Sequence, residues 1–302
     1  MEAIMRSALL SLSKNRTLNK AAKKYGLRFG AQRFVAGSTL EEALGQVTQL
    51  NQAGILTVMD HLGEFISTRE EASEATQLCI ETLEGIHRKK VSSHLSVKMT
   101  QLGMDLDEDF CIANMERILT RAKEYGIFVR IDMEDSARCQ ITLNIFKKLR
   151  AKFDNVGLVL QAYLYRTIQD AEDLRANLRL VKGAYKEPKE VAFPLKTDVD
   201  NNLKRLTEIQ MLHGDYVAVA SHDIKIIEHA KAFAAEHQIP RSQFEFQMLY
   251  GICTDLQKQL VKDGYTVRVY VAYGTDWFGY YTRRLAERPA NVLFILKNLF
   301  KK

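Results

Sequence analysis

Eight short runs of β-branched and apolar residues recur along the chain, and a stretch with helical periodicity follows each of them. The runs are 55–60 (ILTVMD), 94–99 (HLSVKM), 128–133 (FVRIDM), 156–163 (VGLVLQAY), 178–185 (LRLVKGAY), 216–222 (YVAVASH), 244–249 (FEFQML) and 267–273 (VRVYVAY). Their spacing of roughly 22 to 40 residues is typical of strand–helix units in a parallel sheet. Eight such units in succession favour a closed (β/α)₈ barrel of the TIM type over an open doubly wound sheet, which rarely has eight parallel strands.

Length and composition fit one domain. The chain has 302 residues, of which 46% are hydrophobic, so one large core can form. We expect a single domain over residues 1–302, with a helical extension over 1–50 and the barrel over 51–302. A basic helix at 6–25 is expected to pack on the outside or the bottom of the barrel, and a long aromatic-rich helix is expected at 276–300.

Two of the intervening helices have clear end signals. Gly126 is expected to cap the helix at 109–125, because glycine adopts the left-handed conformation in which many helices end. Asp135 or Ser136 is expected to cap the amino end of the helix at 136–152.

Charge and cysteine usage argue against several classes of function. The 43 basic and 37 acidic side chains give a mild net charge of +6, and no concentrated basic stripe with stacking aromatic residues indicates a nucleic-acid partner. The four cysteines form no C-x-x-C pair, so we expect no metal site and a reducing compartment. No window is apolar enough for a signal peptide or a membrane span, so we expect a cytoplasmic protein.

Polar side chains gather at the carboxyl ends of the expected strands, where barrel enzymes place their chemistry. In chain order they are Asp60, His61, Glu64, Lys98, Asp132, Gln161, Arg179, Lys182, Gly183, Tyr185, Ser221, His222, Asp223, Gln247, Leu249, Tyr270 and Tyr273. Charged groups within apolar strands are costly unless they are paired or functional, which singles out Lys98, Asp132, Arg179 and Lys182. Two interpretations stay open, namely a functional site and structural ion pairs, such as Lys98–Asp132, that close the barrel mouth.

The last expected helix carries adjacent arginines, Arg283 and Arg284, in the run YYTRRLAER. Neighbouring residues on a helix point about 100° apart, so both guanidinium groups reach one anion only near a cleft. Such a pair can grip a carboxylate through bidentate hydrogen bonds, and Tyr280 lies on a neighbouring face of the helix. The alternative is a solvated basic face on which Glu287 pairs with Arg283.

These motifs together resemble the proline dehydrogenase family, and in particular its monofunctional bacterial members. The resemblance rests on LRLVKGAY, FEFQMLYG, RVYVAYG and YYTRRLAERPAN, and it extends from MDHLGE at 59–64 to ERPAN at 287–291. It implies oxidation of L-proline to 1-pyrroline-5-carboxylate, the first step of proline catabolism to glutamate, with hydride passing from C5 of proline to N5 of FAD. It also implies that electrons pass to a quinone through transient contact with the inner face of the membrane. The oligomeric state stays open.

The resemblance further implies roles for individual residues. Asp132 and Arg179 would be catalytic, with Arg179 beside flavin N5, and Glu64 would pair with Arg283 when the site closes. The implied substrate-binding residues are Lys98, Leu249, Tyr270, Tyr280, Arg283 and Arg284. The implied FAD-binding residues are Met99, Met133, Gln161, Arg179, Lys182, Gly183, Ala184, Ser221 and His222.

Two other functions compete with this interpretation. A Schiff-base aldolase would use Lys98 or Lys182 as its nucleophile, but the arginine pair and Tyr270 have no part in that chemistry. A non-enzymatic basic module would bind nucleic acid or acidic partners. His222 also has a structural alternative as a capping or core histidine.

Overall fold

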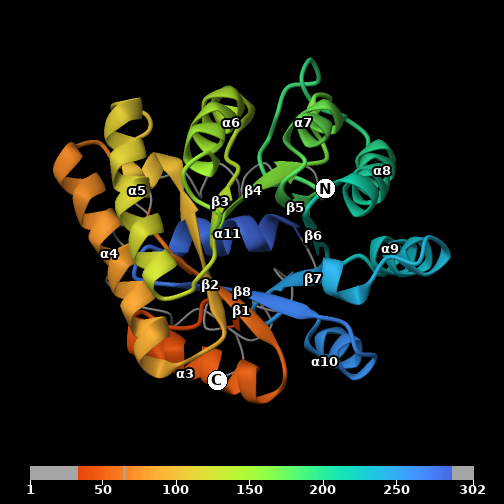
Figure 1. Ribbon diagram of the computed structural model, residues 1–302, viewed down its shortest axis with the longest axis horizontal. Coiled ribbons are helices and arrows are strands. Elements are labelled where there is room, and N and C mark those ends of the chain that lie inside the picture. The colour runs from red at the N-terminus through yellow and green to blue at the C-terminus, as the bar shows by residue number, and fades with distance from the viewer. Residues whose placement is uncertain (1–32, 64–65, 288–302) are drawn as a thin grey trace, which may run out of the picture.

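The expected strands form, and each pairs in parallel with the next, so the sheet closes where β8 pairs with β1 (Figure 1). This computed structural model describes residues 33–63 and 66–287, and of residues 283–287 only the backbone. The described strands are β1 (Leu56–His61), β2 (Ser93–Lys98), β3 (Val129–Asp132), β4 (Val156–Gln161), β5 (Asn177–Val181), β6 (Tyr216–Ala220), β7 (Phe244–Leu249) and β8 (Val267–Tyr273). The prediction of a closed (β/α)₈ barrel is confirmed.

Helices surround the sheet and cover its outer face (Figure 1). The described α-helices are α3 (Leu40–Gln52), α4 (Arg69–Lys89), α5 (Glu108–Glu124), α6 (Ser136–Arg150), α7 (Thr167–Leu174), α8 (Lys196–His213), α9 (Ile224–Glu236), α10 (Thr254–Lys262) and α11 (Trp277–Glu287). The short 3-10 helices are η2 (Met99–Leu102) and η3 (Arg241–Gln243). None of the helices in the described ranges is both long and apolar enough to cross a membrane. The expected helix at 6–25 and residues 288–300 of the expected last helix lie outside the described residues.

The predicted strands start within one residue of the observed ones, but the predictions for β4, β5 and β6 end two to four residues too late. Apolar residues such as Ala162, Tyr163 and Ala184 continue past β4 and β5 into the following loops, so hydrophobicity alone does not mark where pairing stops. After β5 the chain turns at Gly183, whose φ of 115° lies outside the range of a strand.

The end of α5 and the start of α6 lie where the sequence predicted them, but the group that caps α6 differs from the predicted one. Gly126 follows α5 with a φ of 67°, as expected for a glycine that ends a helix. Asp135 occupies the N-cap position of α6, but its carboxylate pairs with Arg138 at 2.6 Å. The cap is supplied instead by Glu187, which accepts from the amide of Ser136 at 2.8 Å and also from its hydroxyl. The loop between β5 and α8 is thereby tied to α6.

The barrel interior below the carboxyl ends is filled by an ionic layer. Glu245 on β7 accepts from Arg268 on β8 at 2.8 and 3.0 Å, and both side chains are buried. Arg130 on β3 donates to the carbonyl groups of Leu158 and Asn177 at 3.2 and 2.7 Å. Burial, together with the neighbouring charge of Arg179, lowers the pKa of Arg130 to about 9. Charged groups with good partners therefore occupy the space that apolar side chains fill in many barrels.

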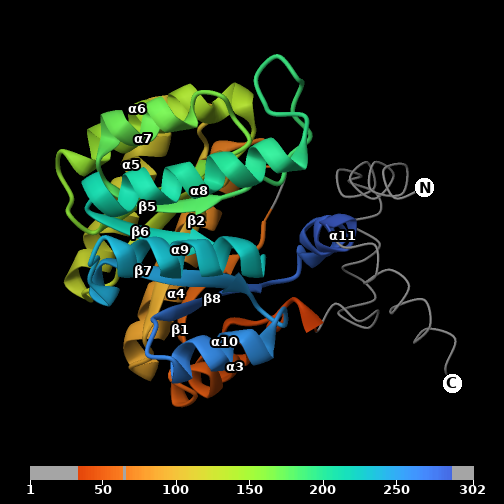
Figure 2. The same ribbon diagram turned by 90° about the vertical axis from the view of Figure 1, so that its right-hand side faces the viewer.

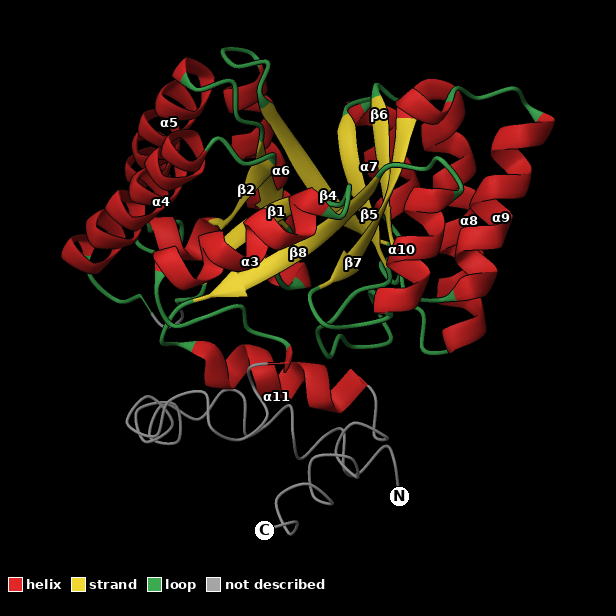
Figure 3. Ribbon diagram, turned by 90° about the horizontal axis from the view of Figure 1, so that it is seen from below, coloured by secondary structure: helices red, strands yellow, loops and turns green. Residues whose placement is uncertain are grey.

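Helix α11 lies across one end of the barrel (Figures 2 and 3). Because it follows β8 after the short link 274–276, this is the end at which the strands reach their carboxyl termini. Trp277, Tyr280 and Tyr281 are buried in a second apolar cluster with Phe34 and Val35, separate from the main core. The helix therefore forms an apolar cover over the barrel mouth.

Candidate active site

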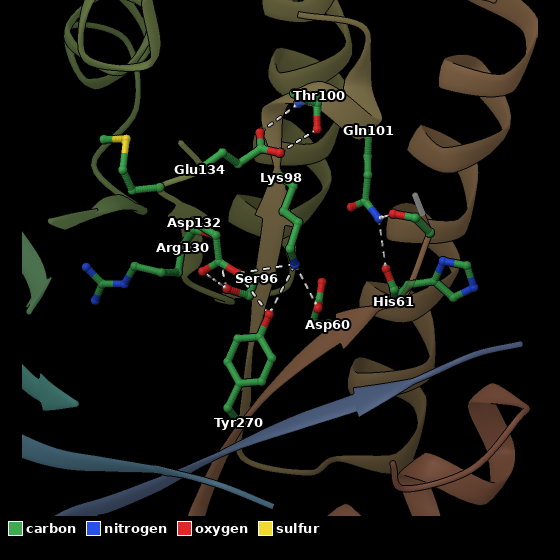
Figure 4. Close-up of polar contacts among 12 residues, drawn as sticks. Asp60, His61, Ser96, Lys98, Thr100, Gln101, Arg130, Asp132, Glu134 and Tyr270 are labelled. Atoms are coloured by element: carbon green, nitrogen blue, oxygen red, sulfur yellow. Dashed lines mark hydrogen bonds and ion pairs between the residues drawn. The ribbon is translucent and has the colours of Figure 1, made fainter. Parts of the chain in front are cut away.

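Lys98 lies at the centre of a buried polar cluster at the barrel mouth (Figure 4). Its Nζ donates to Oδ2 of Asp60 at 2.9 Å, to Oδ2 of Asp132 at 3.4 Å and to the hydroxyl of Tyr270 at 3.3 Å. The barrel brings these residues together from β1, β2, β3 and β8. Lys98 and Asp132 are directly paired in the sheet register, so both side chains point inward at the same height.

Asp132 is the most fully hydrogen-bonded member of this cluster. Its Oδ1 accepts from Ser96 Oγ at 2.7 Å and from Arg179 Nη1 at 2.8 Å. Its Oδ2 accepts from the Tyr270 hydroxyl at 2.8 Å, in addition to Lys98. The guanidinium of Arg179 also lies over the Tyr270 ring, 5.4 Å from its centroid. Four of the predicted site residues thus form one connected network.

The two carboxylates beside Lys98 are shifted in opposite directions. Burial raises the pKa of Asp60 above its ordinary value, and Lys98 offsets this only in part. Burial also acts to raise the pKa of Asp132, but Lys98 and Arg179 outweigh it, so that pKa lies below its ordinary value. Burial alone would lower the pKa of Lys98, yet Asp60, Tyr270 and Asp132 raise it well above its usual range. Environments that separate two carboxylates in this way are typical of active sites.

An apolar wall stands beside the polar cluster. Leu249 is the register partner of Tyr270 on the neighbouring strand, and both pack against the cluster that contains Tyr280 and Trp277 of α11. The predicted pocket residues Leu249, Tyr270 and Tyr280 are therefore gathered at one place. A small ring bound here would meet apolar surface on one side and charge on the other.

The predicted FAD residues on β2 to β5 lie around the same barrel end. Gln161 is the last residue of β4, and its Nε2 reaches the carbonyl of Met133 at 3.4 Å. Gln161 Oε1 and Arg179 Nε are buried polar atoms that have no hydrogen-bond partner among the described residues. Met99 is fully buried in the main core, and its carbonyl accepts from the amide of Met104 at 3.0 Å. Ala184 is partly exposed in the loop after β5.

Lys182, predicted to contact FAD, belongs to an ion-pair cluster just after β5. Its Nζ lies 2.5 Å from Oδ1 of Asp200 on α8 and 2.8 Å from Oδ2 of Asp223. Ser221 Oγ accepts from the amide of Asp223 at 3.1 Å, which fixes the turn after β6. His222 Nε2 accepts from the amide of Leu249 at 3.0 Å and so links β6 to β7. This hydrogen bond is consistent with the interpretation of His222 as a structural residue.

Gly183 is required by packing that the sequence did not reveal. A Cβ at this position would lie 1.3 Å from Cδ1 of Tyr163, and the backbone φ of 115° disfavours any side chain. The Tyr163 hydroxyl in turn reaches Glu187 at 3.5 Å. The turn after β5 is therefore held by close contact with the loop after β4.

Replacing Gly183 by alanine is expected to lower the free energy of unfolding by about 3 kcal/mol or more, because backbone strain and collision with Tyr163 add together. Gly126→Ala is the matched control, since its φ of 67° is also positive but no described atom lies within 4 Å of the new Cβ. The control should lose only about 1–2 kcal/mol. Urea unfolding of both variants measures the difference, and equal losses would show that the Tyr163 contact is unimportant.

The side chains of three predicted site residues lie outside the described part of the structure. Arg283 and Arg284 belong to α11, which crosses the barrel mouth, but their side chains lie outside the described residues. Glu64 lies outside the described residues altogether, so the gating pair with Arg283 stays a prediction.

Sequence reasoning missed several residues of this site. Ser96 could have been found, because it stands two residues before Lys98 and so points to the same face of β2. Asp60 was recognised at a strand end but was given no role. Asp200 and Glu187 carry no local signal, since their partners lie 18 and 51 residues away and are brought close only by the fold.

Comparisons with known proteins agree on one family. The family model described as proline dehydrogenase matches residues 43–297. Proline dehydrogenase 1 of Bacillus subtilis (strain 168) is 49% identical over 302 residues, which cover 99% of this chain and 100% of that protein. The proline dehydrogenase of Deinococcus radiodurans is 42% identical, with 100% of this chain and 99% of that protein covered.

A solved structure supports the same fold. Proline utilization A (PutA) from Bdellovibrio bacteriovorus, inactivated by N-propargylglycine, superposes with a TM-score of 0.81 and 25% identity. The match covers 86% of this chain and 33% of the PutA chain, so this chain spans about a third of that protein.

Proposed function

Because the chain belongs to the proline dehydrogenase family, its reaction is the oxidation of proline, and we propose that this reaction takes place at the carboxyl end of the barrel with FAD as the bound oxidant. The observation that carries the proposal is the network of Lys98, Asp132, Arg179 and Tyr270, which presents charge next to an apolar wall. The product would be 1-pyrroline-5-carboxylate.

The donor set at the barrel mouth fits a flavin. Gln161 Oε1 and Arg179 Nε are buried without a described partner, and one accepts while the other donates. A ring that offers both a donor and acceptors would satisfy such atoms. We propose that Gln161, Arg179, Ser221 and His222 hold the flavin end of FAD, with Met99, Met133, Lys182, Gly183 and Ala184 along its length. When bound, FAD supplies N5 as the acceptor of the hydride from C5 of proline.

The protein's own part is to orient the substrate and to control its charge. Lys98, with Arg283 and Arg284, would bind the carboxylate, and a carboxylate held at several points fixes the ring relative to the mouth. The apolar wall of Leu249, Tyr270 and Tyr280 disfavours a charged ring nitrogen, so it favours the free amine from which hydride can leave. Arg179 would stabilise negative charge that develops beside it.

The aldolase alternative does not suit these lysines. A Schiff-base lysine must lose its proton, but the pKa of Lys98 is raised well above its usual range by Asp60, Tyr270 and Asp132 despite the opposing effect of burial. Lys182 is held between the carboxylates of Asp200 and Asp223. The Lys98 ammonium is thus stabilised in the charged form that is not nucleophilic, and Lys182 is already engaged by two carboxylates.

We also propose that a quinone accepts the electrons, as the family resemblance implies. This requires the protein to contact a membrane. For the described part of the chain the contact would be peripheral, because no helix there is long and apolar enough to span a bilayer. The site for this contact would be the inner membrane face, with the protein otherwise cytoplasmic.

Steady-state oxidation of L-proline with an artificial electron acceptor tests the proposed reaction. FAD-loaded protein should reduce the acceptor in the presence of L-proline and form 1-pyrroline-5-carboxylate in equal amount. D-Proline is the control, because it presents the same groups in the wrong arrangement for a site that fixes the carboxylate. Turnover that does not depend on L-proline would contradict the proposal.

Replacing Arg284 by alanine is expected to raise KM for L-proline at least about tenfold, because a bidentate contact with the carboxylate is lost. FAD content should stay at the wild-type level, since the contact is with the substrate. Initial rates across a proline series, together with the flavin-to-protein absorbance ratio, measure both quantities. An unchanged KM would remove Arg284 from the site.

A further inference from the structure

Asp60 is the most deeply buried charged group that contacts Lys98. Its side chain is 1% exposed, compared with 14% for Asp132 and 19% for Lys98. It also makes the shortest of the three Lys98 contacts, at 2.9 Å against 3.3 and 3.4 Å. The proposed reaction gives Asp60 no role, although a buried carboxylate is costly unless it serves a purpose.

The two carboxylates depend on Lys98 to very different degrees. Asp132 accepts from Ser96, Arg179 and Tyr270 as well, so it stays fixed when Lys98 moves. Asp60 has fewer partners: Lys98 donates to its Oδ2 at 2.9 Å, the Tyr270 hydroxyl is a second hydrogen-bond partner, and its Oδ1 has none among the described residues. Lys98 is therefore the one cation that bonds to Asp60 among the described residues, whereas Asp132 is also held by Arg179 and Ser96.

The ammonium of Lys98 has no spare N–H for a substrate. It carries three protons, and the three contacts to Asp60, Asp132 and Tyr270 use all of them. A carboxylate that binds to Lys98 must therefore replace one existing acceptor. The contacts at 3.3 and 3.4 Å are the weaker ones, and both acceptors keep other partners when they lose Lys98.

We propose that Asp60 is a positioning residue, which anchors the Lys98 ammonium at the barrel mouth while its contacts with Tyr270 or Asp132 are exchanged for the substrate carboxylate. The inference rests on the proposed function, because it assigns Lys98 to the substrate. Asp60 itself does not touch the substrate in this arrangement.

Electrostatics supports the anchor. The ionisable groups that act on Asp60 or are affected by it are Lys98, Asp132, Tyr270, His61, Cys79 and Tyr273. Burial is the largest effect on the pKa of Lys98 and lowers it, whereas Asp60 is the largest of the effects that raise it. Without the charge of Asp60, the pKa of Lys98 should therefore fall, and the ammonium should lose its proton at a lower pH.

Asp60→Asn tests the anchor, because it removes the charge and keeps the shape. The FAD-loaded variant is compared with wild type in kcat and KM for L-proline. Binding of cyclopentanecarboxylate, which has the ring and the carboxylate but no amine to oxidise, is measured by calorimetry from neutral to alkaline pH. Glu134→Gln is the matched control, since Glu134 is a half-buried carboxylate that bonds to Thr100 instead of Lys98.

The anchor predicts an increase of about 10- to 100-fold in KM and in the Kd of cyclopentanecarboxylate, with a smaller change in kcat. The alkaline loss of binding should move to lower pH by about one unit or more, because Lys98 deprotonates earlier. The Glu134→Gln control should keep the wild-type Kd and pH profile.

Two results would overturn the inference. One is that Asp60→Asn binds cyclopentanecarboxylate with the wild-type Kd and loses binding at the same alkaline pH as wild type. The other is that Asp60→Asn lowers kcat and leaves KM unchanged. If Asp60→Asn does not fold, Asp60→Glu decides, because it keeps the charge but displaces it. A raised KM for L-proline, with binding lost at the same alkaline pH as in wild type, then supports the anchor. An unchanged KM contradicts it. Failure of the wild-type protein to oxidise proline would instead contradict the proposed function, and the binding data would show this separately.

Discussion

Replacing Lys98 by methionine is expected to lower kcat/KM for L-proline at least about 100-fold, because the change removes the cation that joins two buried carboxylates. Methionine keeps the length of the side chain and most of its apolar contacts. It leaves Asp60 and Asp132 facing each other without the ammonium, and it removes the proposed partner of the substrate carboxylate. Both consequences act on the site rather than on the outer helices.

Lys148→Met is the matched control for this variant. Lys148 on α6 forms an exposed ion pair with Glu108 on α5 at 2.7 Å, and solvent screening leaves such a pair with little effect on stability. Steady-state kinetics of both variants, with FAD content and thermal unfolding recorded in parallel, separates loss of chemistry from loss of folding. Activity of Lys98→Met within a few-fold of wild type would show that the cluster is a structural closure of the barrel.

The largest expected loss of stability follows from breaking the ionic layer inside the barrel. Arg268→Met should lower the free energy of unfolding by about 3–5 kcal/mol, because Glu245 is then left buried without its cation. Gln247 and Tyr216 still donate to Glu245, but neither of them carries a charge. The carbonyl of Thr57 also loses the donor that it has at 3.0 Å.

Chemical denaturation of three variants tests this claim. Lys123→Met, which breaks the exposed pair with Asp154, should leave the free energy of unfolding almost unchanged. The double variant Arg268→Met with Glu245→Leu should recover much of the stability, because the buried carboxylate is removed together with its partner. If Arg268→Met and the Lys123→Met control lose equal stability, the ionic layer contributes little.

The stability difference should also depend on pH in a fixed direction. Burial alone would raise the pKa of Glu245, but Arg268 outweighs it and holds that pKa below its ordinary value. A carboxylate with a lowered pKa stabilises the fold above its unfolded pKa of about 4.3, and this contribution is lost as pH falls through the folded pKa. The gap between wild type and Arg268→Met should therefore shrink below about pH 4.

The sequence predicted the barrel because its signal is local and repeated. Each strand is a short apolar run, and each helix has its own periodicity, so the strand starts could be found within one residue. Lys98 and Asp132 could be singled out as site residues because charge inside an apolar strand is costly. Their meeting at one height follows from the parallel register of β2 and β3.

The remaining features depend on how loops and helix faces are oriented, which the sequence does not encode locally. Lys182 meets Asp200 only because α8 returns along the barrel with that face inward. The predicted cofactor role of Gly183 gave no hint that the ring of Tyr163 occupies the space of its missing Cβ. Glu187 caps α6 from another loop, whereas local rules gave that role to Asp135 or Ser136.

The central claim is that this barrel mouth oxidises L-proline with a bound flavin, and one anaerobic spectrum tests it most directly. FAD-loaded protein is mixed with L-proline without oxygen while the visible absorption of the flavin is recorded. The account predicts that the bands of oxidised flavin bleach with L-proline and persist with D-proline. Flavin bands that stay unchanged at saturating L-proline would contradict it.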